Sequence, residues 1–252
     1  MTNHYYVTHL YPDYMSIYGD YGNILTLKYY CEQLGLNFVY QPVNFGDDLP
    51  ITTNLYFFGG GQDKEQMLIY PDLLGKQARL REDLLVKNIG MLAICGGYQA
   101  LGQEFITGDG DVIPGLNILP ITTKAPNSQV SGRAIGNIVV ESEFFGGDLV
   151  GFENHSGQTY FVDKERDCNP IGTVKLGYGN NMEQKIEGCL YKNIIGSYMH
   201  GPMLPKNPEI TKWIITQTTT LDAVQKAQLD DLDISIAIKA REQLINRLIK
   251  KP

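Results

Sequence analysis

Short apolar runs alternate with amphipathic stretches over the first hundred residues of the chain. These patterns predict strands at 5–10, 36–43, 55–58 and 89–94. Helices are predicted at 23–34, at 63–87 with an interruption near Pro71, and from Tyr98 onward. Strands that alternate with helices indicate βαβ units, and strands as uniformly apolar as 55–58 are typical of a parallel sheet covered on both faces.

The second half of the chain has a different pattern. Residues 105–200 are rich in glycine and alternate between apolar and polar positions, as at 134–140, which predicts antiparallel strands. A further strand is predicted at 193–199, followed by helices at 208–217 and 233–248. The expected fold is therefore α/β, with a mostly parallel central sheet flanked by helices and with added antiparallel strands. No linker-like segment divides the chain, so residues 1–252 are expected to form a single domain.

Composition and charge exclude several classes of function. The net charge of −7 provides no basic surface for nucleic acid, and no apolar run approaches the roughly 20 residues of a membrane span. The first 20 residues contain no Lys or Arg, so no secretory signal is expected and the chain should be cytoplasmic. The four cysteines form no C-x-x-C pair, which predicts neither a disulfide framework nor a metal site, and no phosphate-binding loop is present.

Cys95 is the strongest candidate for a chemical role. It follows a buried strand and precedes a helix, and Ala93 and Gly97 supply the small residues that a sharp strand-to-helix turn needs on either side of a nucleophile. A position near a helix N-terminus also favours the thiolate form. The alternative is a buried structural cysteine, which is the interpretation we give to Cys31 on its apolar helical face. Cys168 and Cys189 have no comparable setting.

A cysteine nucleophile needs a base, and the chain contains four histidines. His4 and His9 fall in the first strand, where a structural or surface role is expected. His200 follows a predicted strand directly, at the edge of the sheet where such folds place their ligands, which makes it a plausible partner of Cys95. His155, in a turn flanked by glycines, is the competing candidate.

Attack on an amide carbon also requires N–H groups that stabilise an oxyanion. The turn at Cys95 places the N–H of Gly96 behind the sulfur. The triplet 59–61, all glycine, ends the neighbouring strand and can bring backbone to the same point, although a flexible turn explains it equally well.

The motifs together resemble class I glutamine amidotransferases of the cobyric acid synthase-like branch. Within that branch the chain is most similar to the amidotransferase subunits of lipid II isoglutaminyl synthases. The similarity extends over nearly the whole chain and is carried by the segments 19–24, 58–66, 94–99, 150–157, 177–181 and 200–207.

The resemblance implies a role for each matching residue. Cys95 would attack the side-chain amide of L-glutamine and form a γ-glutamyl thioester, with His200 as the acid and base. Gly60 and Gly96 would form the oxyanion hole. Substrate contacts are implied for Gln99 and for Arg133, whose planar guanidinium suits the glutamine α-carboxylate.

One departure concerns the group that orients the histidine. Triad members of the class carry a Glu two residues after the His, and here that position is Pro202. Asp20, Glu153 or a carboxylate from a partner chain could take this role. The hypothesis from the sequence is that the partner completes the site, so that the isolated subunit is a slow glutaminase.

The resemblance also implies a partner. It would be a Mur-ligase-like synthetase subunit of the MurT type, which binds ATP and Mg²⁺ and amidates the D-glutamate α-carboxyl of lipid II. No cofactor is expected in this chain. The alternatives are an amidotransferase that serves a different synthetase, a γ-glutamyl hydrolase-like peptidase, and a non-catalytic interaction subunit of the same fold.

Overall fold

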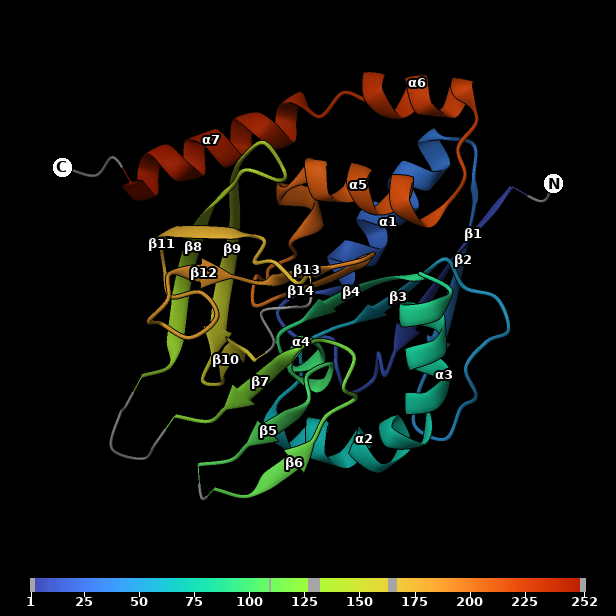
Figure 1. Cartoon of the computed structure of the whole chain (residues 1–252). Helices are drawn as coiled ribbons and strands as arrows, with labels where there is room; N and C mark the ends of the chain where they lie inside the picture. The colour runs from blue at the N-terminus through green and yellow to red at the C-terminus, as the bar shows by residue number, and fades with distance from the viewer. Residues whose placement is uncertain (1–2, 109, 127–131, 163–166, 250–252) are drawn as a thin grey trace.

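The computed structural model describes residues 3–108, 110–126, 132–162 and 167–249 of the chain. Its centre is a six-stranded sheet with the order β13-β14-β4-β3-β1-β2 (Figure 1). All neighbouring strands in this sheet are parallel except β13 and β14, which are antiparallel. The strands are β1 (His4–Leu10), β2 (Asn37–Val43), β3 (Leu55–Phe58), β4 (Gly90–Ile94), β13 (Cys189–Tyr191) and β14 (Ile194–Ser197). The predicted parallel α/β sheet is therefore confirmed.

Helices cover both faces of this sheet. Figure 1 shows α1 (Tyr21–Gln33) and α5 (Pro208–Thr218) on one side, with α2 (Asp63–Gly75) and α3 (Gln77–Arg81) on the other. Alternating strand side chains reach opposite layers. Tyr5 of β1 hydrogen-bonds Thr218 of α5, whereas Tyr56 of β3 donates to Asp83 of the π-helical turn η1 (Glu82–Val86) at 2.8 Å. The uniformly apolar strands are thus explained by burial on two sides.

The predicted break near Pro71 is wrong, because Pro71 lies inside α2 and the helix continues to Gly75. A proline inside a helix removes one backbone hydrogen bond, the one that its N–H would donate to the carbonyl of residue 67. Met67 is exposed, so water can solvate its carbonyl in place of that bond. The chain instead breaks at Lys76, between α2 and α3.

Two four-stranded sheets follow from the second half of the chain. Their orders are β10-β7-β5-β6 and β12-β11-β8-β9, and all pairs are antiparallel except β5 with β7. This confirms the predicted antiparallel additions. The strands are β5 (Glu104–Ile106), β6 (Val112–Pro114), β7 (Ile121–Lys124), β8 (Ala134–Ser142), β9 (Gly147–His155), β10 (Gln158–Phe161), β11 (Gly172–Leu176) and β12 (Ile186–Glu187).

Further helical segments complete the fold. They are α4 (Gly96–Ala100), the 3-10 turn η2 (Leu204–Lys206), α6 (Ala223–Asp231) and α7 (Ser235–Ile249). The sequence patterns did not predict α6, although Asp222 and Gln225 form a reciprocal capping box at its start. The predicted amphipathic helix α7 is anchored to α5 because Arg241 donates two hydrogen bonds of 2.7 Å to Glu209. Within the described ranges no helix is long and apolar enough to cross a membrane.

Candidate active site

Cys95 lies on a strained bend between β4 and α4. Its backbone adopts φ +52° and ψ −108°, a conformation that residues other than glycine rarely populate and that is concentrated at functional sites. The bend brings the chain against β3. A Cβ on Gly97 would stand 2.5 Å from the carbonyl oxygen of Phe58, so only glycine fits there. The sharp turn predicted around Cys95 is confirmed, and the Cys95 side chain is close to fully buried.

His200 reaches the same place from the neighbouring strand. β14 runs parallel to β4, and the N–H of Cys95 donates to the carbonyl of Ser197 at 2.8 Å, so both chains leave the same edge of the sheet. A Cβ placed on Gly60 would lie 2.5 Å from Cε1 of His200 and 3.4 Å from Cβ of Cys95. The cysteine and the imidazole are therefore neighbours across Gly60, and a side chain at position 60 would displace the ring.

Asp20 holds the imidazole from the other side. Its Oδ1 lies 3.1 Å from Nδ1 of His200, and its Oδ2 accepts the N–H of Gly60 at 2.9 Å. The Asp20 and His200 side chains are fully buried. Asp20 occupies the N-cap position of α1 but makes no capping hydrogen bond, because its carboxylate is directed to His200 and Gly60. Of the three carboxylate sources that the sequence left open, Asp20 is the one in contact with His200.

The neighbours of His200 favour its protonated form. Burial by itself lowers the pKa of His200. The hydrogen bond to Asp20 and the adjacent Cys95 outweigh this effect and raise the pKa from the ordinary value of 6.5 to about 10. A pKa raised in this way favours the imidazolium form of the ring, and an imidazolium favours the thiolate form of a neighbouring cysteine.

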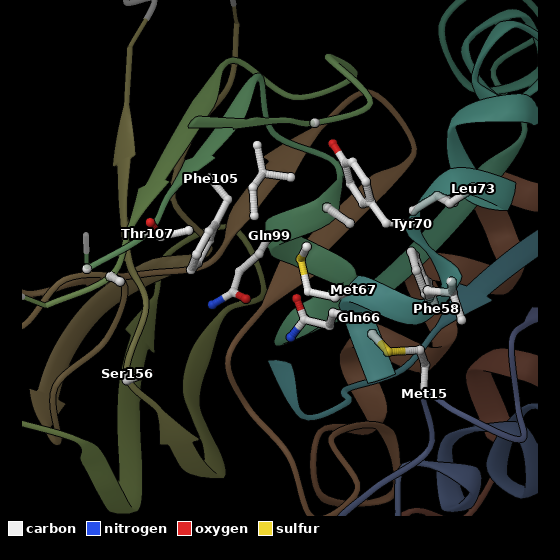
Figure 2. A pocket seen from close by; sticks show the side chains of 17 residues that line it. Met15, Phe58, Gln66, Met67, Tyr70, Leu73, Gln99, Phe105, Thr107 and Ser156 are labelled. Carbon is white, nitrogen blue, oxygen red and sulfur yellow. The ribbon is translucent and has the colours of Figure 1, made fainter. Parts of the chain in front are cut away.

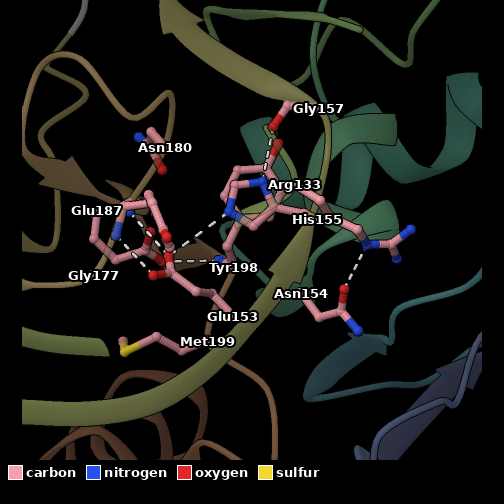
Figure 3. Close-up of polar contacts among 12 residues, drawn as sticks. Arg133, Glu153, Asn154, His155, Gly157, Gly177, Asn180, Glu187, Tyr198 and Met199 are labelled. Atoms are coloured by element: carbon pink, nitrogen blue, oxygen red, sulfur yellow. Dashed lines mark hydrogen bonds and ion pairs between the residues drawn. The ribbon is translucent and has the colours of Figure 1, made fainter. Parts of the chain in front are cut away.

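His155, the competing candidate, lines the same cleft as Cys95, but its contacts are made in a different cluster (Figure 3). Its ring stacks on Tyr198 with centroids 3.6 Å apart, and its Nδ1 lies 2.8 Å from the carbonyl oxygen of Gly157. Its Nε2 is 3.8 Å from Oε2 of Glu153. Glu153 in turn accepts two backbone N–H groups at 2.7 and 3.0 Å, so it serves this buried cluster and does not orient His200.

A cleft of about 580 Å³ opens in front of Cys95. Its lining includes Gln99, Arg133 and Lys64, and no carboxylate from the described part of the chain. Arg133 is exposed, and its Nε donates to Oδ1 of Asn154 at 2.6 Å. Gln99 donates from Nε2 to the Tyr198 hydroxyl at 3.1 Å. The structure thus brings Cys95, Gln99 and Arg133 to one cleft whose size suits an amino acid.

The predicted oxyanion hole needs one correction. Gly60 lies in the site, but its N–H donates to Oδ2 of the buried Asp20 at 2.9 Å, and a buried carboxylate without hydrogen-bond donors is costly. Gly60 therefore supports Asp20 and leaves room for His200. Gly96, at the start of α4 directly after the nucleophile candidate, remains as the predicted oxyanion donor.

A second cavity of about 210 Å³ adjoins this cleft and is mostly apolar. Figure 2 shows Met15, Phe58, Met67 and Leu73 on its walls. It shares four lining residues with the cleft, namely Gln66, Gln99, Phe105 and Ser156. The two spaces are therefore contiguous along the side of Gln99.

The remaining cysteines lie elsewhere. Cys31 is buried in the hydrophobic core, as predicted. The Cys168 and Cys189 sulfurs are 2.6 Å apart, a contact that the sequence spacing gave no reason to expect. Among residues 3–108, 110–126, 132–162 and 167–249, no group of three His, Cys, Asp or Glu side chains is placed to hold a metal ion.

The sequence patterns missed Tyr18 and Asn154. The Tyr18 ring meets His200 edge to face at a centroid distance of 5.0 Å, and Tyr18 and Asn154 both line the cleft with Cys95. The available signal was position: Tyr18 directly precedes the segment 19–24, and Asn154 lies inside the segment 150–157, both of which carry the resemblance.

Comparison with known proteins places this site in a family. Residues 6–208 match the CobB/CobQ-like glutamine amidotransferase domain. Two curated relatives are named as GatD, the glutamine-hydrolysing lipid II isoglutaminyl synthase subunit. The Streptococcus pneumoniae protein is 41% identical, with 88% of this chain and 84% of the relative covered. The Staphylococcus aureus protein is 36% identical, with 96% and 95% covered. A probable cobyric acid synthase of Methanocaldococcus jannaschii is 31% identical over 69% of this chain but only 34% of its own length.

Solved structures show the same fold at lower identity. A glutamine amidotransferase from Thermotoga maritima superposes with a TM-score of 0.52 at 18% identity, covering 98% of this chain and 99% of its own. The glutaminase domain of a Trypanosoma brucei CTPS with bound acivicin gives a TM-score of 0.52 at 12% identity, covering 91% and 95%. With its fold, its Cys95–His200 arrangement and its matches over most of the sequence, the chain belongs to the family of CobB/CobQ-like glutamine amidotransferases.

Proposed function

We propose that this chain is the glutaminase subunit of a lipid II isoglutaminyl synthase. The observation that carries the proposal is the convergence of His200 and Asp20 around Gly60 beside Cys95, which lines the cleft. The two relatives named as GatD, each aligned over more than four fifths of both chains, support the choice of acceptor. The partner would be the Mur-ligase-like synthetase of the MurT type, which would bind ATP and Mg²⁺ and activate the D-glutamate α-carboxyl.

The proposed chemistry uses this chain's own side chains. The Cys95 thiolate attacks the side-chain amide carbon of glutamine, and the N–H of Gly96 stabilises the oxyanion. The tetrahedral intermediate collapses as its C–N bond breaks, and the imidazolium of His200 protonates the departing amide nitrogen, which leaves as ammonia. A γ-glutamyl thioester remains on Cys95. His200, now neutral, activates a water that hydrolyses the thioester to glutamate and regenerates the thiolate–imidazolium pair.

Arg133 and Gln99 are the proposed substrate contacts. The two terminal nitrogens of the Arg133 guanidinium suit the glutamine α-carboxylate, because its Nε is already bonded to Asn154. The hydrogen bond from Gln99 to Tyr198 fixes the amide so that its oxygen is the group left for a substrate N–H. The adjoining apolar cavity offers a dry space in which ammonia would stay neutral on its way to the synthetase.

The test is a coupled assay. We expect the purified chain to release equal amounts of ammonia and glutamate from L-glutamine. Adding the synthetase, ATP, Mg²⁺ and lipid II should convert the lipid to its D-isoglutamine form. Because Asp20 belongs to this chain, hydrolysis should be measurable without the synthetase. Ammonia release only from γ-glutamyl peptides would support the peptidase alternative, and no release under any condition would support a non-catalytic subunit.

Asp20→Asn should lower kcat for glutamine about 10²- to 10³-fold, since a neutral amide no longer stabilises the imidazolium or fixes its tautomer. Losing this partner should also lower the pKa of His200 from about 10. A pKa raised on folding contributes stability below the unfolded value of 6.5, and that contribution is lost as pH rises through about 10. The alkaline limbs of both activity and stability should therefore move to lower pH in the variant.

Glu153→Gln provides the matched control for Asp20→Asn. Glu153 is an equally buried carboxylate, but it contacts His155 and two backbone N–H groups. Its loss should lower the thermal midpoint without moving the alkaline limb of kcat. Equal effects of the two variants on the pH profile would contradict the assignment of Asp20.

A further inference from the structure

A hydrogen-bonded chain of three side chains crosses the mouth of the cleft. The Tyr18 hydroxyl accepts from Nδ2 of Asn154 at 2.6 Å, and Oδ1 of Asn154 accepts from Nε of Arg133 at 2.6 Å (Figure 3 shows the second bond). At its other end the Tyr18 ring meets the His200 ring edge to face. One continuous set of contacts therefore joins the proposed carboxylate-binding group to the proposed acid and base.

The backbone positions of Asn154 and Tyr18 are set by contacts other than the hydrogen bonds of their side chains. Asn154 lies on β9, paired with Ile135 of β8, and its strand neighbours Glu153 and His155 point into the buried cluster. Asn154 itself is half-buried and lines the cleft. Tyr18 adopts φ +55°, in the left-handed region where a tyrosine is uncommon. The turn that contains Tyr18 also contains Asp20. In this conformation the Tyr18 ring contacts the His200 ring edge to face.

We propose that Tyr18 and Asn154 are positioning residues that set Arg133 in advance for the glutamine α-carboxylate and cover His200. The inference rests on the proposed glutaminase function and goes beyond it by explaining how the exposed Arg133 is held. An arginine free in solvent must lose side-chain freedom when it binds a ligand. Asn154 removes much of that freedom and occupies Nε, so a carboxylate must bind the two terminal nitrogens end-on.

The chemistry predicts which ligands depend on these contacts. Amino acids with a free α-carboxylate should need Tyr18 and Asn154, and a glutamine whose α-carboxyl is esterified should not. The phenol hydroxyl serves Arg133 through Asn154, whereas the ring serves His200. The two functions of Tyr18 can therefore be separated by substitution.

Tyr18→Phe keeps the ring and removes the hydroxyl. We expect a 5- to 10-fold higher KM for glutamine with kcat changed less than about 2-fold, the signature of lost ground-state binding. Asn154→Ala should give the same or a larger rise, and the double variant should add nothing to it, because both substitutions break one chain of contacts. Tyr18→Ala should in addition change the pH profile of kcat, because His200 loses the aromatic ring that packs against it.

Two comparisons make the result decisive. With glutamine α-methyl ester, Tyr18→Phe and the wild type should give the same kcat/KM. Tyr29→Phe is the control, because Tyr29 is a similarly exposed tyrosine of α1 outside the cleft, and it should leave KM unchanged. An unchanged KM for glutamine in Tyr18→Phe, or an equal loss with the ester, would overturn the inference.

Calorimetry separates this inference from the proposed function. In a Cys95→Ala background, which binds but cannot turn over, adding Tyr18→Phe should weaken glutamine binding 5- to 10-fold. Such weakening would support the positioning role even if hydrolysis required the synthetase. Equal affinity of the Cys95→Ala protein with and without Tyr18→Phe would reject it. Absence of glutamine binding to either protein would reject the proposed function and the inference together.

Discussion

Cys95→Ala is expected to leave no measurable glutaminase activity, a loss of at least about 10⁴-fold in kcat. No other thiol can replace the nucleophile. Cys31 is buried in the core, and Cys168 and Cys189 contact each other away from the lining of the cleft. Only Cys95 combines the strained bend, the adjacent imidazolium and the N–H of Gly96. Ammonia release from L-glutamine, followed with a coupled dehydrogenase assay, measures the effect.

Two further variants separate chemistry from folding. Cys95→Gly should be as inactive as Cys95→Ala but more stable than the wild type by about 1 kcal/mol, because glycine adopts φ +52° without strain. Cys31→Ala should be less stable, since it leaves space in the core, yet it should retain wild-type kcat. Ammonia release by Cys95→Ala at a rate near that of the wild type would contradict the thioester mechanism.

The bend at Cys95 was predictable because its constraints are local. A sulfur on a tight turn needs small neighbours, and Ala93 and Gly97 are visible in the sequence. The parallel sheet was predictable for a similar reason, since burial on both faces leaves uniformly apolar strands. The position of His200 followed from strand direction alone, because parallel strands end at the same edge of a sheet.

The role of Asp20 was not predictable from local pattern. An aspartate just before a helix is typical of an N-cap, and Asp20 occupies that position without capping. What redirects its carboxylate is contact with Gly60 and His200, which are 40 and 180 residues away in the sequence. The same limit applies to Gly60. The sequence shows that residue 60 is a glycine. It does not show that the Gly60 N–H donates to Asp20, because that bond depends on where the segment of Asp20 lies in the fold.

The links from Tyr18 to Asn154 and from Asn154 to Arg133 are long-range in the same sense. They join a turn before α1 to β9 and to the residue that directly precedes β8, and no periodicity relates these segments. Arg133 itself resembles an ordinary exposed charge until its Nε is seen bonded to Asn154. Functional side chains on loops are positioned by the scaffold around them, so their roles appear only when the elements are assembled.

His200→Ala should reduce kcat at least about 10³-fold, because both the departing ammonia and the attacking water lose their proton carrier. His155→Ala should keep kcat within about 10-fold, since that ring stacks on Tyr198 and bonds the Gly157 carbonyl. Its main effect should be on stability, a loss of about 1–3 kcal/mol from a buried stacked ring. Turnover and thermal unfolding measured on both variants should thus give opposite rankings.

A pH series makes this comparison more specific. Wild-type activity should persist to alkaline pH because the pKa of His200 is raised to about 10, whereas the residual activity of His200→Ala should lack that alkaline limb. His155→Ala should keep it, because Asp20 still contacts His200 when His155 is removed. If His155→Ala instead lost the limb and His200→Ala retained it, the base would have to be reassigned to the cluster of His155, Glu153 and Tyr198. That cluster already reaches the cleft, because His155 lines it together with Cys95, and Gln99, another lining residue, is hydrogen-bonded to Tyr198.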